Sequence, residues 1–99
     1  MNFIIYSTFQ NSLDRLQADD QKQSKLTAMD LQLNPTSSGH NFHKLDRARD
    51  PRFWSVRVNR GLRIIVYRDP SRLILCYVDH HDKAYRWAQK RKLETNPKT

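Results

Sequence analysis

The segment VDHHDKAYRWAQKRK, residues 78–92, concentrates side chains that can move protons and bind phosphate. It contains two adjacent histidines, His80 and His81, and then Tyr85. Histidine can act as a base or as an acid near neutral pH, because its unperturbed pKa is about 6.5. In a helix, His81 and Tyr85 would lie on one face, one turn apart, whereas His80 and Tyr85 would not. The segment is therefore either part of a catalytic site or a charged helix that only begins with histidines.

Cleavage of RNA without a metal is the reaction that these residue types suit. The ribose 2′-OH serves as an internal nucleophile, and the reaction needs a base, an acid and cations that stabilise charge on the phosphate. Arg57 and Arg63 suit the phosphate, because a guanidinium stays charged and can bind two oxygens at once. Tyr85 can stack on a nucleobase or donate a proton. The candidate catalytic residues are His81, His80, Arg63 and Tyr85.

The net charge of +8 is distributed unevenly along the chain. Residues 1–43 carry three cations and four acids, whereas residues 44–92 carry fourteen cations and five acids. This asymmetry indicates a surface for a polyanion, with nucleic acid as the first candidate. The alternative is a generally basic, solvated surface. The candidate nucleic-acid contacts are Lys44, Arg47, Arg49, Arg57, Arg60, Lys90, Arg91 and Lys92.

The sequence does not indicate a metal or a cofactor. His40 and His43 are closely spaced and His80 and His81 are adjacent, but no second cysteine or helical histidine–carboxylate pattern completes a zinc site. Cys76 lies in the apolar run LILCYV, and we expect it to be a small buried side chain in a reducing cytoplasm. We therefore expect neither a metal nor a cofactor.

The length of 99 residues fits a single domain, residues 1–99, whose end is frayed from about residue 94. MNFIIYSTFQ has no basic region before its short apolar run, so we expect no secretory signal. No stretch approaches the roughly 20 apolar residues of a membrane span. The expected location is the cytoplasm, without a membrane partner.

The first half of the chain has the pattern of a strand followed by two helices. Residues 2–7 are β-branched and aromatic, which favours a strand, and Ser7 or Thr8 can cap the helix that follows. Pro35 ends the second helix. We expect this helical hairpin to cover a sheet, with Met29 in the core. The expected apolar stripes are Phe9, Leu13 and Leu16 in the first helix, and Leu26, Met29 and Leu33 in the second.

The second half of the chain begins with an expected loop and continues with three strands and a helix. The turn after the first of these strands contains Gly61, which can supply a permissive backbone. The third strand is nearly continuously apolar and suits a position covered on both faces. The helix begins at Asp79 or His80, with Ala84 and Trp87 on its apolar side. The loop and strands are residues 34–51, 52–58, 62–68 and 72–78.

This α+β order of N-terminal strand, helical hairpin, three-stranded antiparallel sheet and C-terminal helix resembles the RelE/ParE family of toxins from bacterial toxin–antitoxin systems. The residues that carry the resemblance lie in three motifs. They are WSVRV with Arg57, GLRIIVY with Gly61, Arg63 and Tyr67, and LILCYVDHHDKAY with His80, His81 and Tyr85.

The resemblance implies a toxin with an antitoxin partner, but it leaves the activity open. RelE-like members are endoribonucleases that cut mRNA, usually at the ribosome, whereas ParE-like members inhibit DNA gyrase and cut nothing. Two departures favour a binding module of the same fold, either a gyrase inhibitor or a helicase-associated docking domain. His81 stands where the family usually has arginine, and the central segment lacks a glutamate. The leading interpretation is the endoribonuclease, and the oligomeric state stays open.

Overall fold

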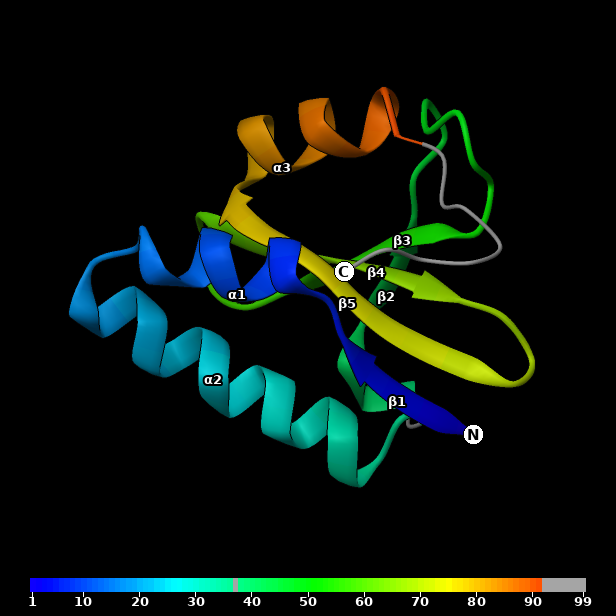
Figure 1. Cartoon of the computed structure of the whole chain (residues 1–99), viewed down its shortest axis with the longest axis horizontal. Coiled ribbons are helices and arrows are strands. Elements are labelled where there is room, and N and C mark those ends of the chain that lie inside the picture. The colour runs from blue at the N-terminus through cyan, green and yellow to red at the C-terminus, as the bar shows by residue number, and fades with distance from the viewer. Residues whose placement is uncertain (37, 92–99) are drawn as a thin grey trace.

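The computed structural model describes residues 1–36 and 38–91, so Lys92 and the tail expected to fray lie outside the described residues. None of the helices in these two ranges is long and apolar enough to cross a membrane. Figure 1 shows the elements in chain order. They are β1 (Asn2–Ile5), α1 (Ser7–Asp14), α2 (Ala18–Leu33), the 3₁₀ turn η1 (Ser38–His40), β2 (Phe42–Lys44), β3 (Phe53–Arg57), β4 (Leu62–Arg68), β5 (Arg72–His80) and α3 (His81–Gln89).

One five-stranded mixed sheet runs through the molecule in the order β1-β5-β4-β3-β2. β1 pairs with β5 in parallel, and the other neighbours are antiparallel. The predicted α+β class is confirmed, but the prediction of a three-stranded sheet is incomplete, because β1 and β2 extend it at its two edges. β2 falls in the segment predicted to be a loop. Three residues in a polar segment are too few to show a strand period, so only pairing with β3 reveals this strand.

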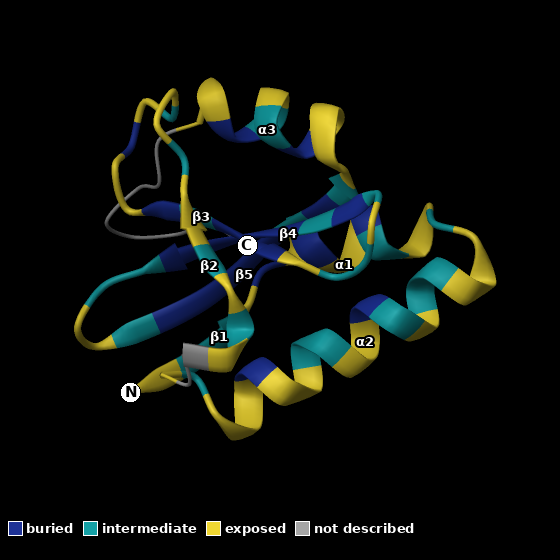
Figure 2. Ribbon diagram, turned by 180° about the vertical axis from the view of Figure 1, so that it is seen from behind, coloured by how far each residue is buried: buried dark blue, intermediate teal, exposed yellow. Residues whose placement is uncertain are grey.

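Helices cover the sheet on both faces: α1 and α2 lie on one face and α3 lies on the other (Figure 1). Alternate residues of β4 reach the two layers, because successive side chains of a strand point to opposite faces. Ile64 and Val66 pack in the cluster that contains Leu31, whereas Ile65 and Tyr67 pack in the cluster that contains Ala84 and Ala88 of α3. Figure 2 shows the middle of β4 and of β5 buried between these layers. The sheet is therefore a rigid base for the side chains that emerge near its ends.

The buried face of α2 differs from the predicted one. Leu26, Met29 and Leu33 are 55%, 57% and 69% exposed, so the prediction that this stripe, with Met29, forms part of the core is wrong. The helix instead buries Ser24 and Leu31. These two residues are two turns apart on one face, and the larger apolar side chains are rotated away from it. Packing of Leu31 into the sheet cluster decides the phase of the helix.

β5 is covered on both faces, as predicted, and it carries the buried Cys76. Burial raises the pKa of the Cys76 thiol to about 12. The backbone carbonyl of Cys76 accepts a hydrogen bond from the Thr8 hydroxyl at 2.6 Å, which ties α1 to the sheet. The expectation that Ser7 or Thr8 caps α1 is wrong, because both lie inside the helix and its N-cap is Tyr6.

Two boundaries near the C-terminal helix also differ from the prediction. β5 continues to His80, which pairs with Leu62, so α3 begins at His81. Gly61 does not supply a special backbone conformation, since no glycine in the described part of the chain has a positive φ. The turn between β3 and β4 is organised by the side chain of Asn59 instead.

Candidate functional site

A cleft of about 490 Å³ lies between α3 and the segment that joins β2 to β3, and we call it the basic cleft. Its lining contains four cationic side chains and one carboxylate, which gives it a positive potential suited to a polyanion. The lining residues are His43, Lys44, Leu45, Asp46, Arg47, Ala48, Ser55, Arg57, Arg63, Tyr85 and Gln89.

The two arginines on the floor of the basic cleft come from neighbouring strands. Arg57 of β3 and Arg63 of β4 are directly opposite in the antiparallel register. Like charges at such positions disfavour the pairing of the strands. No ion pair within residues 1–36 and 38–91 involves either guanidinium. An anion bound between the two side chains would relieve their repulsion, so this pair is the strongest candidate for a phosphate contact.

Backbone carbonyls of the β3–β4 turn hold both guanidinium groups. The Asn59 carbonyl accepts a hydrogen bond from Arg57 Nε at 3.3 Å and another from Arg63 Nη1 at 2.8 Å. Asn59 Oδ1 also accepts from the backbone N–H groups of Gly61 and Leu62, at 3.0 Å each. Its Nδ2 donates to Gln23 Oε1 of α2 at 2.5 Å. Asn59 therefore connects the arginine pair, the turn and the helical layer.

Asn59→Ala is expected to lower the free energy of unfolding by about 1–3 kcal/mol, because two backbone donors and Gln23 lose their partner. Urea-induced unfolding followed by circular dichroism measures this change. Gln23→Ala is the matched control: it removes only the link to α2 and should cost about 0.5–1.5 kcal/mol. If the two variants are equally stable, the Asn59 side chain does not organise the turn.

α3 brings Tyr85 to the basic cleft and His81 to the side of Tyr85. The two rings have centroids 6.3 Å apart, as expected for residues one turn apart on a helix. His81 Nδ1 lies 2.9 Å from Asp82 Oδ1, and its backbone N–H donates to the Gly61 carbonyl at 2.8 Å. This last bond fixes the start of α3 against the turn that holds the arginines.

His80 belongs to a different part of the surface. It lines a second cleft of about 410 Å³ on the side of α3 that faces α1. The charged groups there are balanced, since Arg15 and Lys83 accompany Asp20 and Asp79. The structure therefore separates the adjacent histidines: His81 lies beside Tyr85, which lines the basic cleft, but His81 is not itself among the lining residues.

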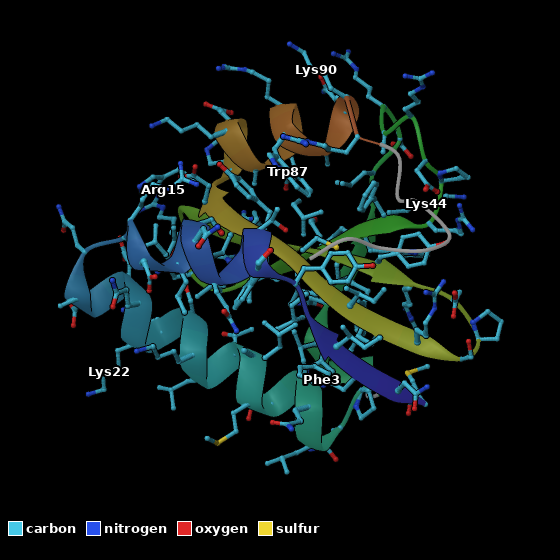
Figure 3. All side chains as sticks on the ribbon, in the orientation of Figure 1. Phe3, Arg15, Lys22, Lys44, Trp87 and Lys90 are labelled. Carbon is cyan, nitrogen blue, oxygen red and sulfur yellow. The ribbon has the colours of Figure 1, made fainter. Side chains whose placement is uncertain are left out.

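The remaining predicted contacts divide between the cleft and the surrounding surface. Lys44 and Arg47 line the basic cleft, whereas Arg49, Arg60 and Lys90 are exposed outside its lining. Figure 3 labels Lys90 near the end of α3 and Trp87 between this helix and the sheet.

Trp87 is half-buried and packs on the core as predicted; it stacks on Tyr77 with ring centroids 4.6 Å apart. Arg91 lies over the Trp87 ring, with its Cζ 5.0 Å from the centroid.

Sequence reasoning did not assign six of the lining residues to the site, and Asp46 and Ser55 are the two whose chemistry matters most here. Asp46 adds a carboxylate that can accept a proton, and it lies in a segment without a regular period, which left no signal. Ser55 shares one face of β3 with Phe53 and Arg57, so the strand period could have predicted its position but not its role.

Among the described residues, no group of three or more histidine, cysteine, aspartate or glutamate side chains could hold a metal ion.

A mixed sheet with a helical hairpin on one face and a C-terminal helix above a basic cleft defines a RelE-like toxin fold. The chain superimposes on the toxin–antitoxin complex RelBE2 from Mycobacterium tuberculosis with a TM-score of 0.63 and 20% identity, over 80% of this chain and 95% of that one. For the RelB–RelE complex from Methanococcus jannaschii the TM-score is 0.66 at 16% identity, over 85% and 96% of the two chains. For YafQ from E. coli strain BL21(DE3) the values are 0.63 and 15%, over 83% and 94%.

These similarities confirm, at the level of the fold, the resemblance predicted from the sequence. No protein-family model matches the chain, and a search of curated proteins found no similar sequence.

Proposed function

We propose that the chain is the toxin of a toxin–antitoxin system and acts as an endoribonuclease that cuts mRNA without a metal. The observation that carries this proposal is the basic cleft, whose lining combines two opposed arginines with Tyr85, while His81 lies outside the lining with its ring 6.3 Å from that of Tyr85. The fold shared with the RelE and YafQ structures supports it. The positive charge of the cleft suits RNA, because several convergent cations are needed to bind backbone phosphates.

In the proposed reaction, Arg57 and Arg63 bind the phosphate at the bond to be cut and stabilise its developing charge. The 2′-oxygen attacks phosphorus after losing its proton to a base, and the 5′-oxygen leaves with a proton from an acid. The products are a 2′,3′-cyclic phosphate and a free 5′-hydroxyl. His81 moves a proton in this reaction, and Tyr85 stacks on the neighbouring nucleobase. His80, in the cleft of balanced charge, takes no part.

The surface around the cleft extends the proposed RNA contact. Lys44 and Arg47 would follow the RNA backbone, and Arg49, Arg60, Lys90 and Arg91 would enlarge the positive field and contact the ribosome. An acidic antitoxin would bind this same surface and close the cleft. Co-expression with the adjacent open reading frame tests that partner: a small acidic protein should co-purify, and its failure to do so would count against an antitoxin.

Induced expression in bacteria, with the 5′ ends of cellular RNA mapped before and after induction, tests the activity. Growth arrest with new cuts inside coding regions is the expected result. Arrest with intact messages and broken chromosomes would replace the proposal with gyrase inhibition. Normal growth of cells that contain folded protein would leave a non-catalytic docking module.

A further inference from the structure

The hydroxyl of Ser55 on the floor of the basic cleft is buried and has no hydrogen-bond partner. Ser55 is 0% exposed. Its Oγ is one of three buried side-chain polar atoms in residues 1–36 and 38–91 without a partner; the others are Tyr6 Oη and Ser24 Oγ. Buried hydroxyl groups are normally hydrogen-bonded, because leaving them unpaired destabilises the folded protein. Of these three atoms only Ser55 Oγ belongs to a residue that lines the basic cleft, which makes it a candidate contact for whatever binds there.

The strand geometry directs Ser55 toward the same space as the arginine pair. On β3, Ser55 and Arg57 are two residues apart and so share a face, and Arg63 lies opposite Arg57. Tyr85 enters the lining from α3. The cleft volume of about 490 Å³ lies within the usual range of about 300–1,000 Å³ for small-ligand pockets. A nucleotide bound in this cleft would thus meet the arginine pair, the Tyr85 ring and the Ser55 hydroxyl.

We propose that the Ser55 hydroxyl binds the edge of a nucleobase and makes the cleft selective for the base that occupies it. This inference rests on the proposed RNA-binding function. Phosphate is expected to bind Arg57 and Arg63 rather than Ser55, because their positive charge is opposite to its own. A hydroxyl can both donate and accept, which matches the mixed groups on a base edge. Stacking on Tyr85 would hold that base in the cleft.

Binding of short single-stranded homopolymers of A, C and U tests the proposal, with 2′-O-methyl riboses to prevent attack by the 2′-oxygen. Fluorescence anisotropy at several KCl concentrations gives the affinity and its salt dependence. Ser55→Ala should bind the preferred homopolymer about three- to tenfold more weakly and discriminate less between bases. Its salt dependence should equal that of the wild type, because a neutral hydroxyl displaces no counterion.

Ser24→Ala is a matched control, since Ser24 is also 0% exposed and unpartnered but lies on α2, on the other face of the sheet. It should bind RNA like the wild type. Neither serine variant should melt below the wild type, because each substitution removes a buried unpaired hydroxyl. Arg63→Ala should bind every homopolymer more weakly and reduce the salt slope by about 1.

The outcomes separate this inference from the function on which it rests. If Arg63→Ala weakens binding while Ser55→Ala binds like the wild type, or weakens equally for all bases, the role of Ser55 is overturned and the RNA site remains. If the wild type binds none of the homopolymers, the proposed RNA site fails and the inference fails with it.

Discussion

His81→Ala is expected to slow RNA cleavage by about two to four orders of magnitude, the usual contribution of a side chain that transfers a proton. His80→Ala should change the rate less than about threefold, because remote surface changes rarely perturb a site. The two histidines are adjacent in the chain, but only His81 lies beside Tyr85, whereas His80 lines the second cleft. The two variants therefore test whether the position of the histidine beside Tyr85 matters for cleavage, and not merely whether a histidine is present.

Single-turnover cleavage of a labelled RNA by each purified variant measures the two rates. Both side chains are exposed, so neither substitution should unfold the protein. Added imidazole should restore part of the activity of His81→Ala if the histidine moves a proton, and should not if it only positions Tyr85. Equal losses for both variants would show that the second cleft takes part in the reaction and would contradict the assignment.

Leu31→Ala is expected to lower the free energy of unfolding by about 2–5 kcal/mol, because the removed side chain leaves a cavity in the core. Leu31 is 0% exposed and packs in the cluster between α2 and the sheet. Met29→Ala lies on the same helix with 57% exposure and should change stability by no more than about 0.5 kcal/mol. Urea-induced unfolding of both variants measures the difference.

The comparison of Leu31 with Met29 isolates the phase of α2, since both substitutions replace a large apolar residue with alanine. The hydrophobic pattern alone chose Leu26, Met29 and Leu33 as the buried stripe, which predicts the opposite result. A larger loss of unfolding free energy for Met29→Ala than for Leu31→Ala would show that this stripe, and not Leu31, is buried. It would also mean that α2 packs on the sheet in another rotation.

The sequence by itself determined the features that depend on local periodicity. Once residues 62–68 are predicted to be a strand, its period of two is enough to place Ile64 and Val66 on one face and Ile65 and Tyr67 on the other. The one-turn spacing of His81 and Tyr85 predicted their proximity. These predictions succeeded because the spacing of side chains along a strand or helix is a property of the backbone and needs no knowledge of distant residues.

Only the tertiary structure decided the features that depend on contacts between distant segments. The rotation of α2 is set by the packing of Leu31 in the cluster on the sheet. The three residues of β2 form a strand because they pair with β3. The separation of His80 from His81 follows from the pairing of β5 with β4 up to His80 and the start of α3 at the next residue. Asp46 and Ser55 enter one cleft with Tyr85 because the sheet brings a loop and a helix together. Long-range packing selects among local patterns that are otherwise equally good, and here it selected both the core and the site.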